Sequence, residues 1–191
     1  CLFLNAKNVT VNGFNFNETM FIDKDKDNVL RKGKLKRNDI VLTTRGTVGN
    51  VAYYSSDICY ENVRINSGMV ILRCDENNIL PEYLYYVLKS NNLQKQINNI
   101  KSGSAQPQLP ISTLKKLEIN FINISLQKNV IKILNTIDKK IELNNQINDN
   151  LLEYGMQSIS NYKGKEFISL RDLSVIISKG TTPTGNDVKK Y

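Results

Sequence analysis

The sequence predicts an α+β fold, in which a mixed β-sheet domain with a few helices is followed by one long coiled-coil helix. Short apolar runs separated by turn residues extend from Cys1 to about Asn78, which is typical of strands. At Pro81 the spacing of apolar residues changes to that of a helix. From Leu126 to about Ser160 a helical pattern continues without proline. This change of period places the sheet first and the long helix after it.

Short strands are predicted throughout the first part of the chain. They are the runs 2–4, 9–11, 14–16, 39–44, 50–54 and 68–73. The connection Arg45–Gly49 contains two glycines, which permit the positive φ that a tight turn needs. Leu117–Phe121 reads as one further strand that closes the domain. Asp23–Asp27, where acids alternate with lysine, reads as a solvated surface turn.

Two helical segments follow the strands. Pro81 opens the first at a first-turn position that tolerates proline, and this helix should end near Lys101. The second takes Ser125 as its N-cap and carries apolar residues three and four apart, with Asn144 in the position of a register-setting polar residue. A rod of roughly 50 Å with such a stripe must pack on another helix or on its own domain. The predicted partner interface is Val130, Ile133, Ile137, Ile141, Asn144, Ile147, Leu151 and Tyr154.

Charge and composition narrow the class of function. The chain has 26 Lys and Arg against 18 Asp and Glu, a net charge of +8. This favours an anionic partner, most commonly nucleic acid, over a merely soluble basic protein. Three cysteines without metal spacing and no histidine argue against a zinc site and against a histidine-based catalytic triad. No stretch approaches the length of a membrane span. We therefore expect a binding protein with no catalytic residues and no metal site.

Two neighbouring segments are candidates for DNA contact. The run Arg31–Arg37 contains five cations in seven residues. It is either an edge that contacts DNA phosphates or a solvated segment that leads into a strand. The turn that follows the next strand offers arginine, threonine and asparagine; arginine reads guanine and asparagine reads adenine. The predicted DNA-contacting residues are Lys34, Lys36, Arg37, Thr43, Thr44, Arg45, Thr47 and Asn50. The loop Ser102–Gln108 offers further polar donors to DNA or protein, or serves as a structural turn.

The order of four segments resembles one known family. They are DIVLTTRGTVGNVAYY at 39–54, LPEYLYYVLKS at 80–90, SGSAQPQLPISTLKKLEI at 102–119 and SLQKNVIKILNTIDKKIELNNQINDNLLE at 125–153. The chain is similar to specificity (S) subunits of type I restriction-modification enzymes. In these, a target-recognition domain ends in a Gly-Ser-x-Gln-Pro-x-Leu loop and a Leu-Lys-Lys strand, and leads into a long spacer helix. Residues 170–183 resemble the start of another recognition domain.

The resemblance implies a subunit that recognises half of a bipartite double-stranded DNA site and scaffolds methyltransferase (M) and restriction (R) subunits. It implies no catalysis in this chain, and it assigns S-adenosylmethionine, ATP and Mg to the partner subunits, in the bacterial cytoplasm. The implied domains are a target-recognition domain at 1–122 that lacks its N-terminal part, a spacer helix at 123–162, and the start of a second recognition domain at 163–191.

Alternatives to this reading stay open. The order of segments fits an internal fragment of a full subunit, or a permuted half-subunit in which Lys189–Tyr191 completes the sheet opened by Cys1–Leu4. The chain also fits the recognition portion of a single-chain restriction-methylation enzyme. A coiled-coil adaptor with an incidental basic surface is a further alternative, and it predicts no salt-dependent DNA binding.

Overall fold

The computed structural model describes residues 1–101, 107–162, 164, 168–174, 176 and 178. The chain divides into two compact units, Cys1–Lys139 and Lys140–Tyr191. The strands and the helices α1 to α4 lie in the first unit. Helix α5 starts in the first unit and contributes its remaining length to the second, where the short helix α6 (Leu170–Leu173) follows. The mixed helix and sheet predicted from the sequence is confirmed.

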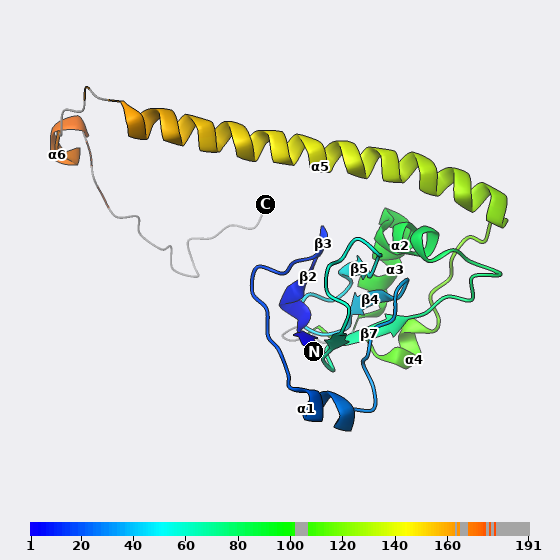
Figure 1. Ribbon diagram of the computed structural model, residues 1–191. Helices are drawn as coiled ribbons and strands as arrows, with labels where there is room; N and C mark the ends of the chain where they lie inside the picture. Colours follow the sequence, from blue (N-terminus) through cyan, green and yellow to red (C-terminus); the bar gives the residue numbers. More distant parts are fainter. Residues whose placement is uncertain (102–106, 163, 165–167, 175, 177, 179–191) are drawn as a thin grey trace, which may run out of the picture. The chain divides into compact units, whose positions relative to one another are not determined.

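A three-stranded antiparallel sheet forms the centre of the first unit (Figure 1). Its middle strand β4 (Ile40–Thr43) pairs with β5 (Val51–Tyr53) on one side and with β7 (Met69–Leu72) on the other. All four residues of β4 are buried. Because successive side chains of a strand point to opposite faces, Ile40 belongs to one apolar core and Val41 to another. A strand that is buried on both faces accounts for the unbroken apolar run.

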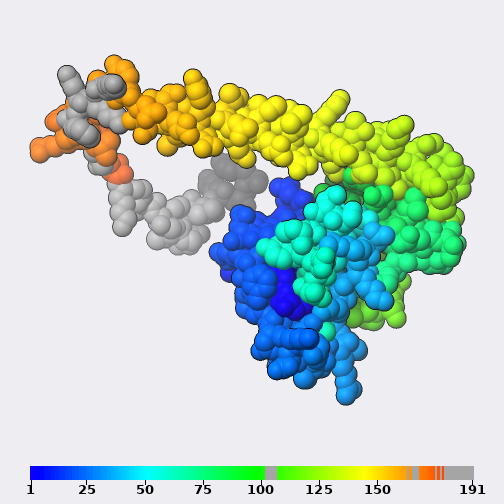
Figure 2. All heavy atoms as spheres, in the orientation of Figure 1, coloured from blue at the N-terminus to red at the C-terminus, as the bar shows by residue number. Residues whose placement is uncertain are grey.

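Two smaller strand pairs complete the first core. β1 (Leu2–Leu4) runs parallel to β6 (Val63–Ile65), and Figure 2 shows the first residues, in dark blue, beside the cyan part of the chain. β2 (Val9–Thr10) and β3 (Gly13–Phe14) form a hairpin, in which Gly13 has a φ of 106°. The core between these elements consists of Leu2, Leu4, Val9, Leu35, Val41, Ala52, Tyr54, Val63, Ile65 and Met69.

Two helices pack on the other face of the sheet, beside β4 and β5 (Figure 1). They are α2 (Pro81–Lys89) and α3 (Asn91–Ile100). The sequence predicted one helix here, which is wrong, because Ser90 has extended backbone and its hydroxyl accepts a hydrogen bond from the amide of Leu93 at 3.4 Å. The break turns α3 so that Leu93 and Ile97 enter the second core. That core consists of Ile40, Leu42, Val51, Leu88, Leu93, Ile97 and Leu109.

Two further segments differ from the predictions. The expected turn at 23–27 forms helix α1 (Lys24–Val29), because the carboxylate of Asp23 caps it by accepting from the amide of Lys26 at 2.6 Å. The expected closing strand at 117–121 is wrong. Its backbone pairs with a side chain instead, since the amide group of Gln96 donates to the carbonyl of Glu118 at 3.0 Å and accepts from its N–H at 3.2 Å. The short helix α4 (Ile111–Leu114) precedes this segment.

Helix α5 (Ile124–Asn161) is 38 residues long and confirms the predicted long helix. Its N-cap is Asn123 and not Ser125, because the side-chain oxygen of Asn123 accepts from the amide of Leu126 at 2.9 Å. Of its residues, Gln127 and Ile131 are buried. Over the described ranges, each helix is too short or too polar to span a bilayer.

Candidate nucleic-acid interface

The turn between β4 and β5 is held from inside by two threonines. Both Thr43 and Thr44 are buried. The hydroxyl of Thr43 donates to the carbonyl of Thr47 and accepts from the amide of Asn50 at 3.0 Å. The hydroxyl of Thr44 donates to the carbonyl of Gly68 at 3.1 Å. These two predicted DNA-contacting residues therefore serve to fix the shape of the turn, and their side chains are not on the surface.

Glycines and an asparagine complete the turn. Gly46 and Gly49 have φ of 74° and 98°, a region that side chains other than glycine rarely adopt. A Cβ at Gly49 would also lie 3.1 Å from the side-chain oxygen of Gln94. The side-chain nitrogen of Asn50 donates to the carbonyl of Val9 at 2.9 Å, so this half-buried amide anchors the turn to the β2–β3 hairpin.

Arg45 and Thr47 are the predicted contact residues that the turn exposes to solvent. Over the described ranges, the guanidinium of Arg45 has neither a hydrogen-bond acceptor nor an ion-pair partner. The hydroxyl of Thr47 lies 3.5 Å from the carbonyl of Ala6, which is a long hydrogen bond. An unpaired arginine on a rigid turn is suited to bind an anionic or acceptor-rich surface.

Part of the basic run is used in folding. Lys34 and the buried Arg64 both form ion pairs with Asp27 of α1. Arg64 also donates to the carbonyl of Lys32 at 2.8 Å. Hydrogen bonds first from Lys34 and then from Arg64 hold the pKa of Asp27 below its ordinary value. This cluster closes the segment before β4 onto β6, and the ammonium of Lys34 is engaged in it.

The other two predicted DNA-contacting cations of the run, Lys36 and Arg37, differ in how their side chains are engaged. Arg37 stacks 4.4 Å above the ring of Tyr54 and donates to the carbonyl of Ser55 at 2.7 Å, so its head group is held against the domain. Lys36 is exposed, and only its backbone is engaged: its N–H donates to the carboxylate of Asp39 at 2.7 Å, and its carbonyl accepts from the amide of Asp39 at 3.0 Å. Of the three cations predicted here to contact DNA, the structure therefore leaves Lys36 with an unengaged side chain among the described residues.

The two predicted groups of contact residues do not lie together. Lys34–Arg37 precede β4 and Thr44–Asn50 follow it, so the strand separates them. Its four residues extend over roughly 13 Å at 3.3 Å per residue. The basic run and the Arg45 turn therefore occupy opposite ends of the central strand.

The predicted helix interface is exposed, with one exception. Side chains along one stripe of α5 keep 46% to 72% of their surface in solvent. These residues are Ile133, Ile137, Ile141, Ile147, Leu151 and Tyr154. Asn144, on the same stripe, is also exposed. Val130 is half-buried, because it faces the helix's own domain and lines a cavity there. These exposed apolar side chains are free to contact another surface.

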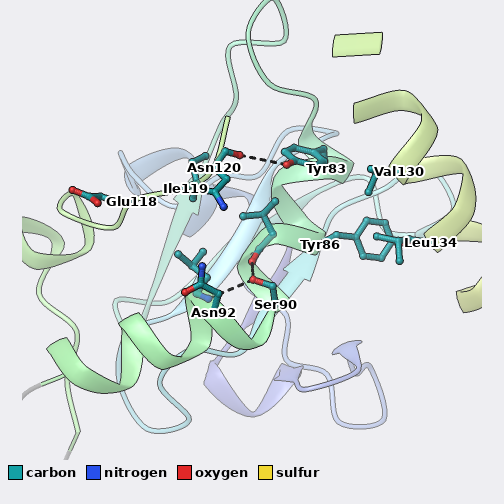
Figure 3. A pocket seen from close by; sticks show the side chains of 11 residues that line it. Tyr83, Tyr86, Ser90, Asn92, Glu118, Ile119, Asn120, Val130 and Leu134 are labelled. Atoms are coloured by element: carbon teal, nitrogen blue, oxygen red, sulfur yellow. Dashed lines mark hydrogen bonds between the residues drawn. The ribbon is translucent and has the colours of Figure 1, made fainter. Parts of the chain in front are cut away.

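The cavity at Val130 has a volume of about 350 Å³ and lies between α2, α3, the segment after α4 and the start of α5. Figure 3 shows Tyr86 from α2 beside Leu134 from α5, with Tyr83 and Asn120 on the opposite wall. The phenol of Tyr83 donates to the carbonyl of Asn120 at 3.4 Å. Most of the lining is apolar, so the cavity offers packing contacts and few groups for chemistry.

Two polar residues that the sequence did not single out join α5 to the domain. Gln127 is fully buried, and its side-chain oxygen accepts from the amide of Leu80 at 2.8 Å. Its nitrogen donates to the carbonyls of Asn78 at 3.1 Å and Ile122 at 2.8 Å. A glutamine in a helix is usually exposed, so nothing local signals this role. The second residue is Tyr86, which bonds to the helix two turns further on.

No catalytic arrangement is visible in the part of the chain that the structure describes. Among these residues, His, Cys, Asp and Glu do not gather in groups of three or more that could hold a metal ion. Burial raises the pKa of the Cys74 thiol to about 11, so this thiol is protonated and a poor nucleophile at neutral pH. Burial raises the pKa of Tyr53 to about 12, which likewise keeps its phenol protonated.

Comparison with known sequences places these features in a family. Residues 7–153 match the type I restriction modification DNA specificity domain. Over 177 residues the chain is 26% identical to the type I restriction enzyme MjaIX specificity subunit of Methanocaldococcus jannaschii, which covers 85% of this chain and 40% of that protein. Over 153 residues it is 30% identical to the type I restriction enzyme HindI specificity subunit of Haemophilus influenzae. This alignment covers 78% of this chain and 32% of that protein. The chain thus spans less than half the length of these relatives.

Solved structures show the same fold. The chain is similar to the HsdS subunit from Thermoanaerobacter tengcongensis with a TM-score of 0.57 at 9% identity, covering 87% of this chain and 45% of that one. It is also similar to a chain from work on complex assembly and conformational transition of the type I R-M system, with a TM-score of 0.57 at 14% identity, covering 96% and 50%. Because the family match extends over more than half of its length, this chain belongs to the family of type I restriction modification DNA specificity domains.

Proposed function

We propose that this chain recognises a sequence in double-stranded DNA as part of a type I specificity subunit, and binds half of a bipartite site. The observation that carries the proposal is the family match over residues 7–153, which includes the sheet, the Arg45 turn and most of α5. The net charge of +8 and the unpaired guanidinium of Arg45 support an anionic ligand. DNA offers both phosphates and the guanine acceptors that arginine binds in pairs.

We propose that the exposed stripe of α5 binds methyltransferase subunits, and that restriction subunits join the assembly through them. A helix with several large apolar side chains exposed on one face requires a partner surface to cover them. The start of the helix is already covered by its own domain at Gln127 and Ile131, and the stripe lies roughly 120° around the axis from these residues. One helix therefore has separate surfaces for its domain and for a partner.

We further propose that the chain itself performs no chemistry. In this proposal S-adenosylmethionine, ATP and Mg belong to the methyltransferase and restriction subunits, and the complex works in the bacterial cytoplasm, where its DNA is. The match to a specificity domain, and to relatives that are named specificity subunits, supports the proposal.

Co-purification with the methyltransferase subunit of the same restriction system tests the scaffold. The chain is tagged and co-expressed with that subunit, and the recovered complex is quantified. A variant with Ile133, Ile137 and Leu151 changed to aspartate should lose the complex, because three charges would be buried against the partner. A control variant adds the same three charges on another face of α5, through Gln146→Asp, Asn150→Asp and Gln157→Asp, and should keep the complex.

The two variants, together with the affinity of the chain for duplex DNA, distinguish the other possible results. Equal loss in both variants would show a general charge effect and would remove the stripe from the proposal. A folded chain that binds neither the methyltransferase subunit nor duplex DNA would overturn the proposed function. Binding to the subunit without salt-dependent DNA binding would leave the adaptor interpretation in place of DNA recognition.

A further inference from the structure

Separate segments of the chain meet at the end of β4 that carries Arg45. The backbone amides of Thr44 and Arg45 donate to the carbonyl of Gly68 at 2.8 and 3.1 Å, which ties the turn to the β6–β7 connection. The amide of Leu109 donates to the carbonyl of Thr44 at 2.9 Å, and Arg45 forms a β-bridge with Gln108. Segments more than twenty and sixty residues away in the sequence therefore hold the backbone of Arg45 in place.

A third segment joins this end from the beginning of the chain. The one-turn helix η1 (Ala6–Asn8) follows β1, and Asn5 caps it. A Cβ built at Gly46 would lie 3.9 Å from the Cβ of Ala6, and the hydroxyl of Thr47 lies 3.5 Å from the carbonyl of Ala6. The residue that follows Ala6 is Lys7, which is exposed. Lys7 and Arg45 thus stand on two adjoining segments.

Neither cation is engaged with the domain. The ammonium of Lys7, like the guanidinium of Arg45, makes no ion pair or hydrogen bond within the described ranges. The exposed Glu18 lines the same surface hollow as Lys7, and the two side chains form no salt bridge. Thr47, Ser67 and Gln108 are also exposed at this end, and these three side chains are polar and uncharged.

The opposite end of β4 has a different electrostatic character. Two cations of the basic run, Lys34 and Arg37, are bound internally. Helix α1, in which two aspartates stand beside two lysines, lies against this run through Asp27. The carboxylate of Glu76 also lies near this run, because it accepts a hydrogen bond from the side chain of Asn38 at 3.4 Å. A duplex approaching this end would meet carboxylates as well as cations, which weakens phosphate binding.

We propose that the end of β4 carrying Arg45 is the DNA-reading end, with Arg45 contacting a base edge and Lys7 contacting a neighbouring phosphate, and that the basic run does not touch the DNA. This inference rests on the proposed DNA recognition and assigns residues to it. Arginine presents a planar fork that matches the paired acceptors of guanine, whereas lysine is a point charge suited to phosphate. The backbone bonds around Arg45 fix the turn before DNA arrives, so little ordering is needed on binding.

The test compares charge-matched variants of the whole chain. Arg45→Gln and Lys7→Gln remove one charge each at the proposed reading end, and Arg31→Gln and Lys32→Gln remove one charge each from the basic run, where both side chains are exposed. The probe is a labelled duplex DNA with a randomised centre, from which the wild-type chain selects its preferred sequences. Affinity is measured by fluorescence anisotropy over a range of salt concentrations, and circular dichroism checks the folding of each variant.

Each variant has its own expected result. Arg45→Gln should bind the selected duplexes about tenfold to a hundredfold more weakly and should select different sequences at one position. Lys7→Gln should weaken binding uniformly across sequences and lower the slope of log affinity against log salt by about one. Arg31→Gln and Lys32→Gln should keep both the selected sequences and the slope.

Two further results have distinct meanings. Loss of slope in Arg31→Gln and Lys32→Gln, with Arg45→Gln and Lys7→Gln unaffected, would overturn this inference and place the DNA on the basic run, while DNA recognition itself would stand. A folded wild-type chain that binds no duplex at low salt would contradict the proposed DNA recognition itself. The two failures are therefore distinguishable.

Discussion

The phenol oxygen of Tyr86 on α2 lies 2.8 Å from the carboxylate of Asp138 on α5 and 2.7 Å from the side-chain oxygen of Asn135. A phenol has one proton and cannot donate to both oxygens. A rotated Asn135 amide, which places its nitrogen toward Tyr86, satisfies all three groups. In that arrangement Asn135 donates to the phenol and the phenol donates to Asp138. Burial and this carboxylate raise the pKa of Tyr86, which keeps its proton in place.

Tyr86→Phe should lower the free energy of unfolding by about 1 kcal/mol, because it removes these hydrogen bonds and preserves the ring that packs beside Leu134. Tyr154→Phe is the matched control, since Tyr154 is 72% exposed and its hydroxyl has no hydrogen bond among the described residues. Urea denaturation, monitored by circular dichroism, gives the free energy of unfolding of both variants. Equal stability of Tyr86→Phe and wild type would show that water replaces the bonds without loss.

Gln127→Leu should be more destabilising, by about 2–4 kcal/mol. The leucine has a similar volume, but it leaves the amide of Leu80 and the carbonyls of Asn78 and Ile122 without the partners that Gln127 supplies. Gln146→Leu, on an exposed position of the same helix, should change the stability by less than about 0.5 kcal/mol. The same denaturation measurement compares them. A loss as small as that of the control would mean that the buried amide groups find other partners.

The pH dependence of stability should depend on Asp27. Lys34 and Arg64 lower the pKa of Asp27 in the folded state, so folding favours the charged carboxylate. The stabilisation is fully present above the ordinary value of 3.8 and is lost as the pH falls through the lowered pKa. Asp27→Asn should therefore melt below wild type at neutral pH, and the difference should shrink in acid. A difference in melting temperature that stays constant from neutral to acid pH would contradict this role.

The elements predicted correctly are those whose signal is local. The apolar run of β4, the glycine turn after it and the spacing of apolar residues in α5 can each be read within a few residues of the chain. The N-cap at Asn123 was missed by two positions, because Asn123 and Ser125 are both good capping residues and only the structure shows which side chain bonds to the helix.

The roles that were missed depend on residues far apart in the sequence. The sequence did not single out Arg64, which is buried against Asp27, 37 residues away. Gln127 bonds to Leu80, 47 residues away. Thr43 and Thr44 resembled donors on an exposed turn, because polarity alone does not show that a hydroxyl bonds inward. Within the predicted Arg45 turn, the sequence therefore did not show which side chains are exposed and which are buried.

Two positions on the same face of α5, five turns apart, should respond differently to the same substitution. Leu134 is half-buried, lines the cavity beside Tyr86 and packs on the domain, so Leu134→Ala should lower the free energy of unfolding by about 2 kcal/mol. Leu152 is 68% exposed, and Leu152→Ala should leave the stability within about 0.5 kcal/mol, since alanine also favours the helix. Thermal unfolding at several protein concentrations measures both changes. A large, concentration-dependent loss in Leu152→Ala would show that the far part of the helix is covered by another copy of the chain in solution. An unchanged stability of Leu134→Ala would mean that the start of α5 does not pack on the domain.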